Sequence, residues 1–297
     1  MIAAIHKCEN NSGPYCAAPV NIHRIDWMWA NKAVFDANGI SVPTTWDELN
    51  AAAEKLQAAG IIPFAHGGQA WQDATVFEAV AMGIGGNNYY KNCYVDLKES
   101  CLRSETTVKV FDQMRKLQGF TDEGSPGRDW NVATGMVIEG KAGFQIMGDW
   151  AKGEFTAAGK VPGVDYYCAA TPSNNGYLYN VDSFIFYKSS DPDKQAGQKL
   201  LAKLMMGKNF QKVFNLYKGS IPARLDVSMD EFDKCAKTSN ADIKTAGASG
   251  GLVPSFAHGM AQGNTMKAAL QDIITEHFNS DMSSVDAANA LADSVLA

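Results

Sequence analysis

The stretch DWNVATGMVIEGKAGFQIMGDW, residues 129–150, says most about how this chain folds. Its pattern predicts an apolar helix, a Gly-Lys turn and a short apolar strand, and an Asp-Trp pair stands at each end. The strand, at residues 142–147, leads into Gly148, Asp149 and Trp150. An indole ring and a carboxylate therefore fall at the carboxyl end of a sheet, the edge where open α/β folds hold their ligands.

The two tryptophans of this stretch, Trp130 and Trp150, are candidates for ligand contact. An aromatic ring packs against the C–H face of a sugar, and a carboxylate accepts hydrogen bonds from sugar hydroxyls. The alternative interpretation makes both tryptophans ordinary core residues. Both interpretations stay open when this stretch is considered by itself.

Length and composition narrow the class of protein. A chain of 297 residues is longer than one typical domain, which favours two lobes. Hydrophobic residues make up 46% and charged residues 20%, as in globular proteins. The net charge of −6 and the lack of a basic run argue against nucleic-acid binding. No apolar stretch reaches the roughly 18 residues that a membrane span requires.

Six cysteines fall into plausible pairs. Cys8 with Cys16 and Cys93 with Cys101 have equal spacing around turn signals, which leaves Cys168 and Cys235 as a third pair across a long loop. Local pairing favours an oxidising compartment, although reduced cytosolic cysteines and other connectivities stay open. No CxxC motif is present, which argues against zinc and thioredoxin-type sites. We expect no cofactor.

Short strands alternate with helices along the chain, which predicts an α/β fold. An N-cap signal at Thr44-Thr45-Trp46 opens one of these helices. The expected strands lie at residues 15–29, 61–65, 166–170 and 181–187. The expected helices lie at residues 31–38, 44–59, 76–82, 106–117, 192–204, 210–217, 265–277 and 285–295. Residues 247–251, rich in glycine, are expected to form a flexible connector.

Four further residues are polar or aromatic at positions that call for an explanation. His23 lies within an extended run, Asp182 begins a strand, and Trp71 with Gln72 follows a strand and a glycine loop. A buried polar side chain needs a partner or a function. The structural alternatives are a hydrogen-bonded core histidine at position 23 and a tryptophan that covers the core at position 71.

Several motifs follow one another along the chain: Pro19-Val20-Asn21-Ile22-His23-Arg24, Trp29-Ala30-Asn31-Lys32, Thr45-Trp46-Asp47-Glu48, Gly140-Lys141-Ala142, Met147-Gly148-Asp149-Trp150, Asn180-Val181-Asp182-Ser183-Phe184, Gly219-Ser220-Ile221-Pro222-Ala223-Arg224 and Ala257-His258-Gly259-Met260. In this order they resemble the extracellular solute-binding proteins of ABC sugar importers. The motifs that begin at Asn180, Gly219 and Ala257 are most similar to the glucose-binding branch of that family.

The resemblance implies a two-lobe, class II periplasmic-binding-protein fold. Residues 1–25 and 182–228 would be the remainder of an incomplete N-terminal lobe, and residues 26–181 and 229–297 the C-terminal lobe. Residues 1–6 do not look like a signal peptide, so we expect the sequence to begin inside a longer exported protein. The implied location is the periplasm.

The resemblance also implies a binding site between the lobes. Trp130 and Trp150 would pack on a pyranose ring, while Asp182, Lys218 and His258 would bond its hydroxyls. His23 would lie on a hinge strand, and Trp71 with Gln72 would line the cleft. The expected function is to bind glucose or a similar aldose and deliver it, as a monomer, to an ABC transporter permease.

Two rival functions are considered. A glycoside hydrolase would use Asp149 with Asp182, or Asp129, as its pair of carboxylates. A carbohydrate-binding module without a transport role would use the same aromatic residues. A Ser183, His258 and Asp182 triad lacks the nucleophile-elbow motif, and we reject it.

Overall fold

A computed structural model describes residues 16–173 and 176–295. Its strands form three small sheets, in the orders β4-β5-β3-β6, β2-β7-β9 and β1-β8. The strands are β1 (Ala17–Pro19), β2 (His23–Arg24), β3 (Trp27–Asn31), β4 (Ile62–Phe64), β5 (Ala142–Ile146), β6 (Tyr166–Ala170), β7 (Tyr177–Asn180), β8 (Ser183–Ile185) and β9 (Leu252–Pro254).

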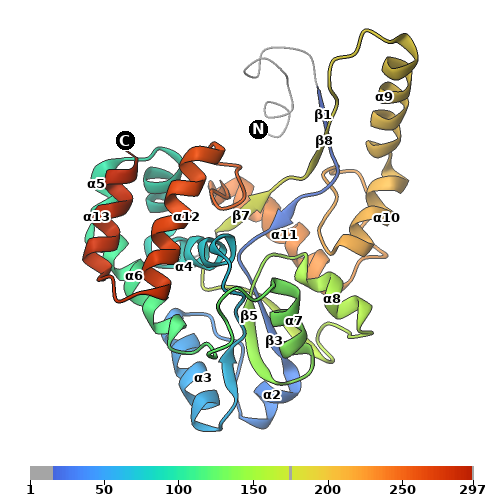
Figure 1. Cartoon of the computed structure of the whole chain (residues 1–297). Helices are drawn as coiled ribbons and strands as arrows, with labels where there is room; N and C mark the ends of the chain where they lie inside the picture. The colour runs from blue at the N-terminus through green and yellow to red at the C-terminus, as the bar shows by residue number, and fades with distance from the viewer. Residues whose placement is uncertain (1–15, 174–175, 296–297) are drawn as a thin grey trace.

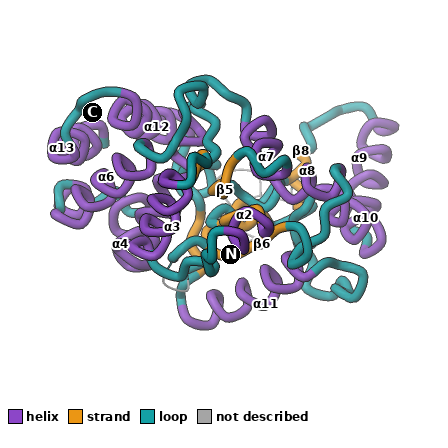
Figure 2. The backbone as a smooth tube through the Cα atoms, turned by 90° about the horizontal axis from the view of Figure 1, so that it is seen from below, coloured by secondary structure: helices purple, strands orange, loops and turns teal. Residues whose placement is uncertain are grey.

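Helices surround these sheets (Figure 1). In Figures 1 and 2, α4, α6, α12 and α13 lie on one side of the strands and α9 with α10 on the other. The helices are α2 (Lys32–Ala37), α3 (Trp46–Ala58), α4 (Ala70–Tyr90), the π-helix η1 (Lys91–Val95), α5 (Glu99–Leu102), α6 (Glu105–Gln118), α7 (Trp130–Ile138), α8 (Ala151–Ala157), α9 (Pro192–Met205), α10 (Lys208–Lys218), α11 (Lys234–Ser249), α12 (Asn264–Asn279) and α13 (Ser284–Ser294). Within the described residues, no helix is long and apolar enough to cross a membrane.

Two chain segments run antiparallel to each other through all three sheets. Residues 17–31 supply β1, β2 and β3, and residues 166–185 supply their partners β8, β7 and β6. Backbone hydrogen bonds continue between the sheets, from Val20 N to Asp182 O and from Ile25 N to Leu178 O. We call this pair of segments the crossing ribbon. It connects the four-stranded sheet to the β1–β8 pair at the far end of the molecule (Figure 1).

The stretch 129–150 forms the helix and strand that its sequence predicts. Helix α7 is followed by β5, all of whose residues are buried. β5 pairs in parallel with β4 and antiparallel with β3, so it lies inside its sheet. Three residues, Met147, Gly148 and Asp149, follow the strand, and Trp150 is then the N-cap residue of α8. The sequence pattern had not predicted α8.

Other elements differ from the predicted ones. The strand expected at residues 181–187 is reduced to β8, because Val181 and Asp182 connect two sheets instead of continuing one. The predicted connector at residues 247–251 is wrong in its first half, because α11 extends to Ser249. Gly250, with φ of +74°, then ends that helix. Between Cys93 and Cys101, the turn signal at residues 96–98 lies in a short non-helical connection, with η1 before it and α5 after it.

Two of the three predicted disulfides are confirmed. Cys93 bonds Cys101, and Cys168 on β6 bonds Cys235 in the first turn of α11. The third predicted pair includes Cys8, which lies outside the described residues.

The beginning of α3 offers a test of the predicted helix start. Thr45 Oγ1 accepts from Glu48 N at 3.2 Å, and the Glu48 carboxylate accepts from Thr45 N at 3.3 Å. We expect Thr45→Ala to lower the free energy of unfolding by about 1 kcal/mol in urea titrations, because the backbone N–H of Glu48 loses its cap. The control Thr106→Ala, within α6, removes no capping bond and should cost nothing. An equal loss in both variants would contradict this assignment.

Candidate functional site

A cavity of about 550 Å³ lies where seven elements or their ends meet. Its volume falls in the range typical of small-molecule sites, which is about 300–1,000 Å³. It contains all the predicted ligand-contacting residues except Gln72. The lining residues are His23, Trp71, Trp130, Trp150, Gly153, Glu154, Asn180, Asp182, Tyr217, Lys218 and His258.

A second hollow of similar volume, about 580 Å³, lies on the surface of α9 and α10. Leu200 and Leu204, which are 70% and 60% exposed, are among its mainly apolar lining residues. It has neither a carboxylate nor an imidazole among those residues. The first cavity, with its aromatic rings and charged groups, is therefore the candidate binding site.

Aromatic rings form one wall of this cavity. The ring of Trp150 lies 5.1 Å from that of His258, 5.2 Å from that of His23 and 6.3 Å from that of Trp71, measured between centroids. Gly148 makes this position of the ring possible, because a Cβ atom there would come within 2.3 Å of the indole. The Gly-Asp-Trp sequence thus allows the ring to fold back over its own backbone.

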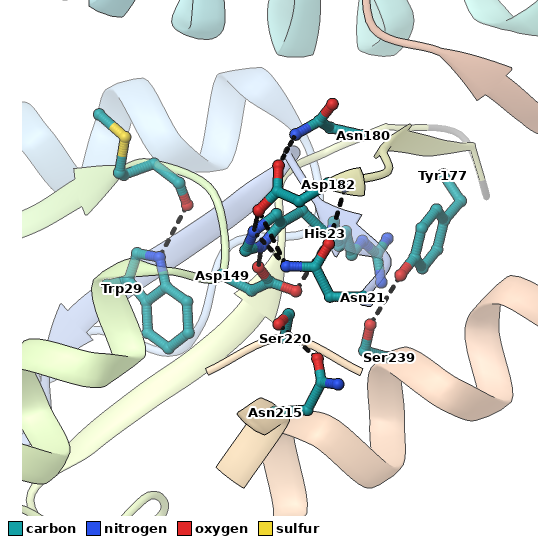
Figure 3. Close-up of polar contacts among 12 residues, drawn as sticks. Asn21, His23, Trp29, Asp149, Tyr177, Asn180, Asp182, Asn215, Ser220 and Ser239 are labelled. Carbon is teal, nitrogen blue, oxygen red and sulfur yellow. Dashed lines mark hydrogen bonds and ion pairs between the residues drawn. The ribbon is translucent and has the colours of Figure 1, made fainter. Parts of the chain in front are cut away.

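Asp182 supplies a partly exposed carboxylate. Its Oδ2 accepts from Asn21 Nδ2 at 3.0 Å and from His23 Nε2 at 2.9 Å, and its Oδ1 accepts from Asn180 Nδ2 at 3.1 Å (Figure 3). Burial alone would raise the pKa of this carboxyl, but the bonds and charge of His23 keep it well below its usual range. Asp182 is thus an ionised acceptor at neutral pH, and its side chain is 41% exposed.

His258 contributes an uncharged imidazole. Burial, together with the positive charge of His23, lowers its pKa to about 3. Its Nε2 lies 3.1 Å from Thr75 Oγ1, and that hydroxyl donates to Trp71 O at 2.8 Å. Since the hydroxyl proton of Thr75 is used in this way, Nε2 must be the donor of the pair and Nδ1 the acceptor. His258 can therefore accept a hydrogen bond through Nδ1.

A buried carboxyl group holds the turn that carries His258. Glu78 on α4 accepts from Ser255 Oγ at 2.7 Å and from Tyr90 Oη at 2.9 Å. Ser255 Oγ in turn accepts from the backbone N–H of His258 at 3.1 Å. Burial raises the pKa of Glu78 to about 8 despite these donors.

Lys218 comes to the cavity at the end of α10. The next residue, Gly219, has φ of +94° and ends the helix in the left-handed conformation. A Cβ atom on Gly219 would lie 2.6 Å from the backbone oxygen of Asp149. Glycine is thus needed twice at this position, for its backbone angle and for the close approach of two segments.

Gln72 lies apart from the cavity. It is fully buried, and its amide nitrogen donates to Gln69 Oε1 and to Arg128 O, both at 3.0 Å. These bonds connect the loop before α4 to the segment before α7. Gln72 therefore supports the wall that carries Trp71.

Some residues of the site carry no recognisable signal in the sequence. Glu154 lines the cavity from α8, a helix that the sequence pattern had not predicted. Asn180 and Tyr217 also line it, and Asn180 had appeared only within a motif. Asn21, Thr75 and Glu78 act through other side chains, so only the folded structure identifies them. In the described part of the chain, no cluster of three or more His, Cys, Asp or Glu side chains could hold a metal ion.

Comparison with known proteins places this geometry in context. The profile of the family described as "Bacterial extracellular solute-binding protein" matches residues 3–205. A "Probable sugar-binding periplasmic protein" of Brucella suis biovar 1 (strain 1330) is 46% identical over 294 residues, which cover 99% of this chain and 69% of the relative. A protein of the same description from Rhizobium meliloti (strain 1021) is 44% identical, with 99% of this chain and 70% of the relative covered.

Solved structures show the same fold at low sequence identity. The bacterial solute receptor AcbH, described as having an exclusive preference for β-D-galactopyranose, has a TM-score of 0.83 at 18% identity and covers 99% of this chain and 75% of its own. Maltose-bound T. maritima MalE3 has a TM-score of 0.75 at 19% identity, with 98% and 74% covered. The predicted two-lobe α/β fold is thereby confirmed. The two sequence relatives are described as sugar-binding proteins, which agrees with the expectation that this chain is not an enzyme.

The buried Glu78 should make stability depend on pH. Its native pKa of about 8 exceeds the ordinary value of 4.5. At a pH between these two values, the native chain keeps a proton that the unfolded chain has released. The free energy of unfolding therefore falls as the pH rises through this window. Other groups add their own pH dependence, so the effect of Glu78 is read as a difference: we expect Glu78→Gln to make the slope of unfolding free energy against pH more positive than in the wild type between about pH 5 and 8, in urea titrations. The exposed control Glu123→Gln should keep the wild-type slope, and an unchanged slope in Glu78→Gln would contradict the buried-acid assignment.

A second prediction concerns the close contact between Gly219 and the backbone of Asp149. We expect Gly219→Ala to lower the free energy of unfolding by about 1–3 kcal/mol, because alanine there is strained and clashes with the Asp149 carbonyl. Gly247→Ala, within α11, meets no atom within 4 Å and should be neutral or stabilising. Thermal unfolding of both variants gives the comparison, and a neutral Gly219→Ala would show that the segments separate without cost.

Proposed function

The chain belongs to the bacterial extracellular solute-binding proteins, and from that premise we propose that it binds a monosaccharide, glucose or a similar aldose, in the 550 Å³ cavity. The bound sugar would then be delivered to the permease of an ABC transporter. Relatives named for sugar binding support a sugar as the class of solute.

The observation that carries this proposal is the meeting of indole rings and hydroxyl-bonding groups in one cavity. Trp71, Trp130 and Trp150 offer aromatic faces for the C–H surfaces of a pyranose. Asp182 and His258 offer acceptors, and Lys218 offers a donor. Each hydroxyl of a sugar can both donate and accept a hydrogen bond, so a site of this composition suits a neutral polyhydroxylated ligand.

Selectivity between sugars would come from the polar groups. A hydroxyl that lacks a partner in a closed site costs about 1–3 kcal/mol. The acceptor positions of Asp182 and His258 would therefore decide which epimer fits. A glucose-like arrangement of hydroxyls is the one we propose, in keeping with the glucose-binding branch that the motifs resemble.

Closure of two lobes would complete the site. We assign residues 1–25 and 182–228 to one lobe and residues 26–181 and 229–297 to the other. By this assignment the crossing ribbon passes from one lobe to the other at residues 25–26 and 181–182, and the backbone hydrogen bond from Ile25 N to Leu178 O spans that boundary. Bending there would bring Asp182 and Lys218 toward Trp130 and Trp150. We also propose a periplasmic location and a monomeric state.

A glycoside hydrolase built on Asp149 and Asp182 has less support. Asp149 is 3% exposed, its Oδ1 bonds His23, and its Oδ2 accepts from Arg24 N at 3.0 Å. It does not line the cavity, so it offers no carboxylate to a glycosidic bond. A carbohydrate-binding module without a transport role would share the same cavity, and only a transport assay separates it from a transport protein.

Trp150 provides the test of the proposed site. In titration calorimetry we expect D-glucose to bind the wild type, and Trp150→Ala to weaken binding by roughly tenfold or more because the sugar loses an aromatic face. The control Tyr187→Ala removes a ring that is 78% exposed and outside the cavity, and it should bind as the wild type does. If no member of an aldose panel binds the wild type, the proposed function is wrong. Turnover of nitrophenyl glycosides would favour the hydrolase instead.

A further inference from the structure

His23 lies between two carboxylates and almost out of contact with solvent. Its Nδ1 bonds Asp149 Oδ1, and its Nε2 lies 2.9 Å from Asp182 Oδ2. The His23 side chain is only 2% exposed, against 41% for Asp182. Since an ionised carboxylate only accepts hydrogen bonds, each ring nitrogen of His23 must donate. The ring therefore carries two protons and a positive charge.

A third contact of the ring bears on this assignment. Asn21 Nδ2 lies 2.9 Å from His23 Nε2, which would suit a neutral ring that accepts from Asn21. However, a lone pair on Nε2 would then also face Asp182 Oδ2, and that contact would be repulsive. Asn21 has its own bonds, because its Oδ1 accepts from Asp182 N at 2.9 Å and its Nδ2 donates to Asp182 Oδ2 at 3.0 Å. Two donors converging on one carboxylate oxygen account for all three distances.

Charge balance agrees with the protonated ring. Burial alone would lower the pKa of His23, but the charges and hydrogen bonds of Asp149 and Asp182 raise it to about 9. The other groups around the ring are Asn21, the edge-on ring of Trp150, and His258, which is itself uncharged. A buried cation thus has a buried anion on one side and a partly exposed anion on the other.

We propose that His23 is a positioning residue: its doubly protonated ring fixes the carboxylate of Asp182 for the sugar and makes no essential hydrogen bond to the sugar itself. This inference rests on the proposed function for the identity of the ligand. It revises the role that the sequence motif implies, because both nitrogens of His23 are already used by protein groups.

The protonated ring of His23 holds three segments of the chain together. From β2, it bonds the turn between β5 and α8 and the connection between β7 and β8 (Figure 3). Asp182 Oδ2 is occupied by His23 and Asn21, so the exposed side of the carboxylate is left for a hydroxyl. Burial lowers the pKa of His258 most, and the positive ring of His23 lowers it further, so that second imidazole is neutral and able to accept. One buried charge therefore acts on two groups that face the cavity.

The first experiment needs no ligand. Nitrogen-15 NMR of the histidine rings in the full chain, assigned with His23→Gln, reports the protonation of each ring nitrogen. We expect both nitrogens of His23 to carry protons at about pH 7.5 and to titrate near pH 9. Asp149→Asn should move that titration to lower pH. A His23 ring that is neutral at pH 7.5 would overturn the proposal, whether or not any sugar binds.

The second experiment measures how His23 acts. Calorimetry with D-glucose compares His23→Gln, Asp182→Asn and the double variant. We expect each single change to weaken binding by about tenfold or more, and the double variant to bind no more weakly than Asp182→Asn alone. Losses that add in the double variant would mean that His23 contacts the sugar independently, and the proposal would fail.

A matched control separates positioning from general damage. His66 is a buried histidine that pairs with Asp73 at 2.6 Å and does not line the cavity. We expect His66→Gln to lower the melting temperature while leaving glucose affinity unchanged. If His66→Gln weakens binding as much as His23→Gln, the effect is one of stability and the inference is wrong. If the wild type binds no aldose, the proposed function fails, and the NMR result still decides the state of His23.

Discussion

The antiparallel pairing of residues 17–31 with residues 166–185 is the constraint on which the rest of this structure depends. Each of the three sheets contains one strand from each segment, so the backbone hydrogen bonds of a single crossing ribbon hold all three in register. His23, Asn180 and Asp182 are attached to this ribbon at its middle. The tryptophans, Lys218 and His258 come to it from helices and loops that pack around it. The candidate site therefore lies beside the middle of the crossing ribbon, between the four-stranded sheet and the β1–β8 pair.

The pairing of charged groups follows from the burial of the middle of the ribbon. The middle of the ribbon is buried, so charged groups there need partners close by. His23 is paired with two carboxylates, and Arg24, the next residue, bonds Asp26 and Asp242. Neighbouring residues of a strand point to opposite faces, which sends the two cations to different sides of the ribbon. Only the pairing around His23 borders the candidate site, where it leaves one carboxylate ionised and one imidazole neutral.

The sequence predicts much of the fold and most of the candidate site, and what it misses has physical causes. The strand at residues 166–170, the helix start at Thr45 and the disulfides at Cys93 and Cys168 follow from local patterns, and the structure confirms them. Helices α8 and α11 were missed because small residues and glycine weaken their apolar periodicity. Asn21, Thr75 and Glu78 could not be predicted, since each matters through a partner more than 150 residues away. Gln72 was predicted to line the cavity, but it lies behind the wall, where its amide nitrogen bonds only protein groups.

The covalent bond between Cys168 and Cys235 limits how this molecule can move. It holds β6 and the first turn of α11 at a fixed spacing. In the proposed closure these two elements would therefore move together, and bending would fall at residues 25–26 and 181–182, where the crossing ribbon passes from one proposed lobe to the other. A covalent cross-link within one lobe would in this way help to fix the axis about which the cavity opens.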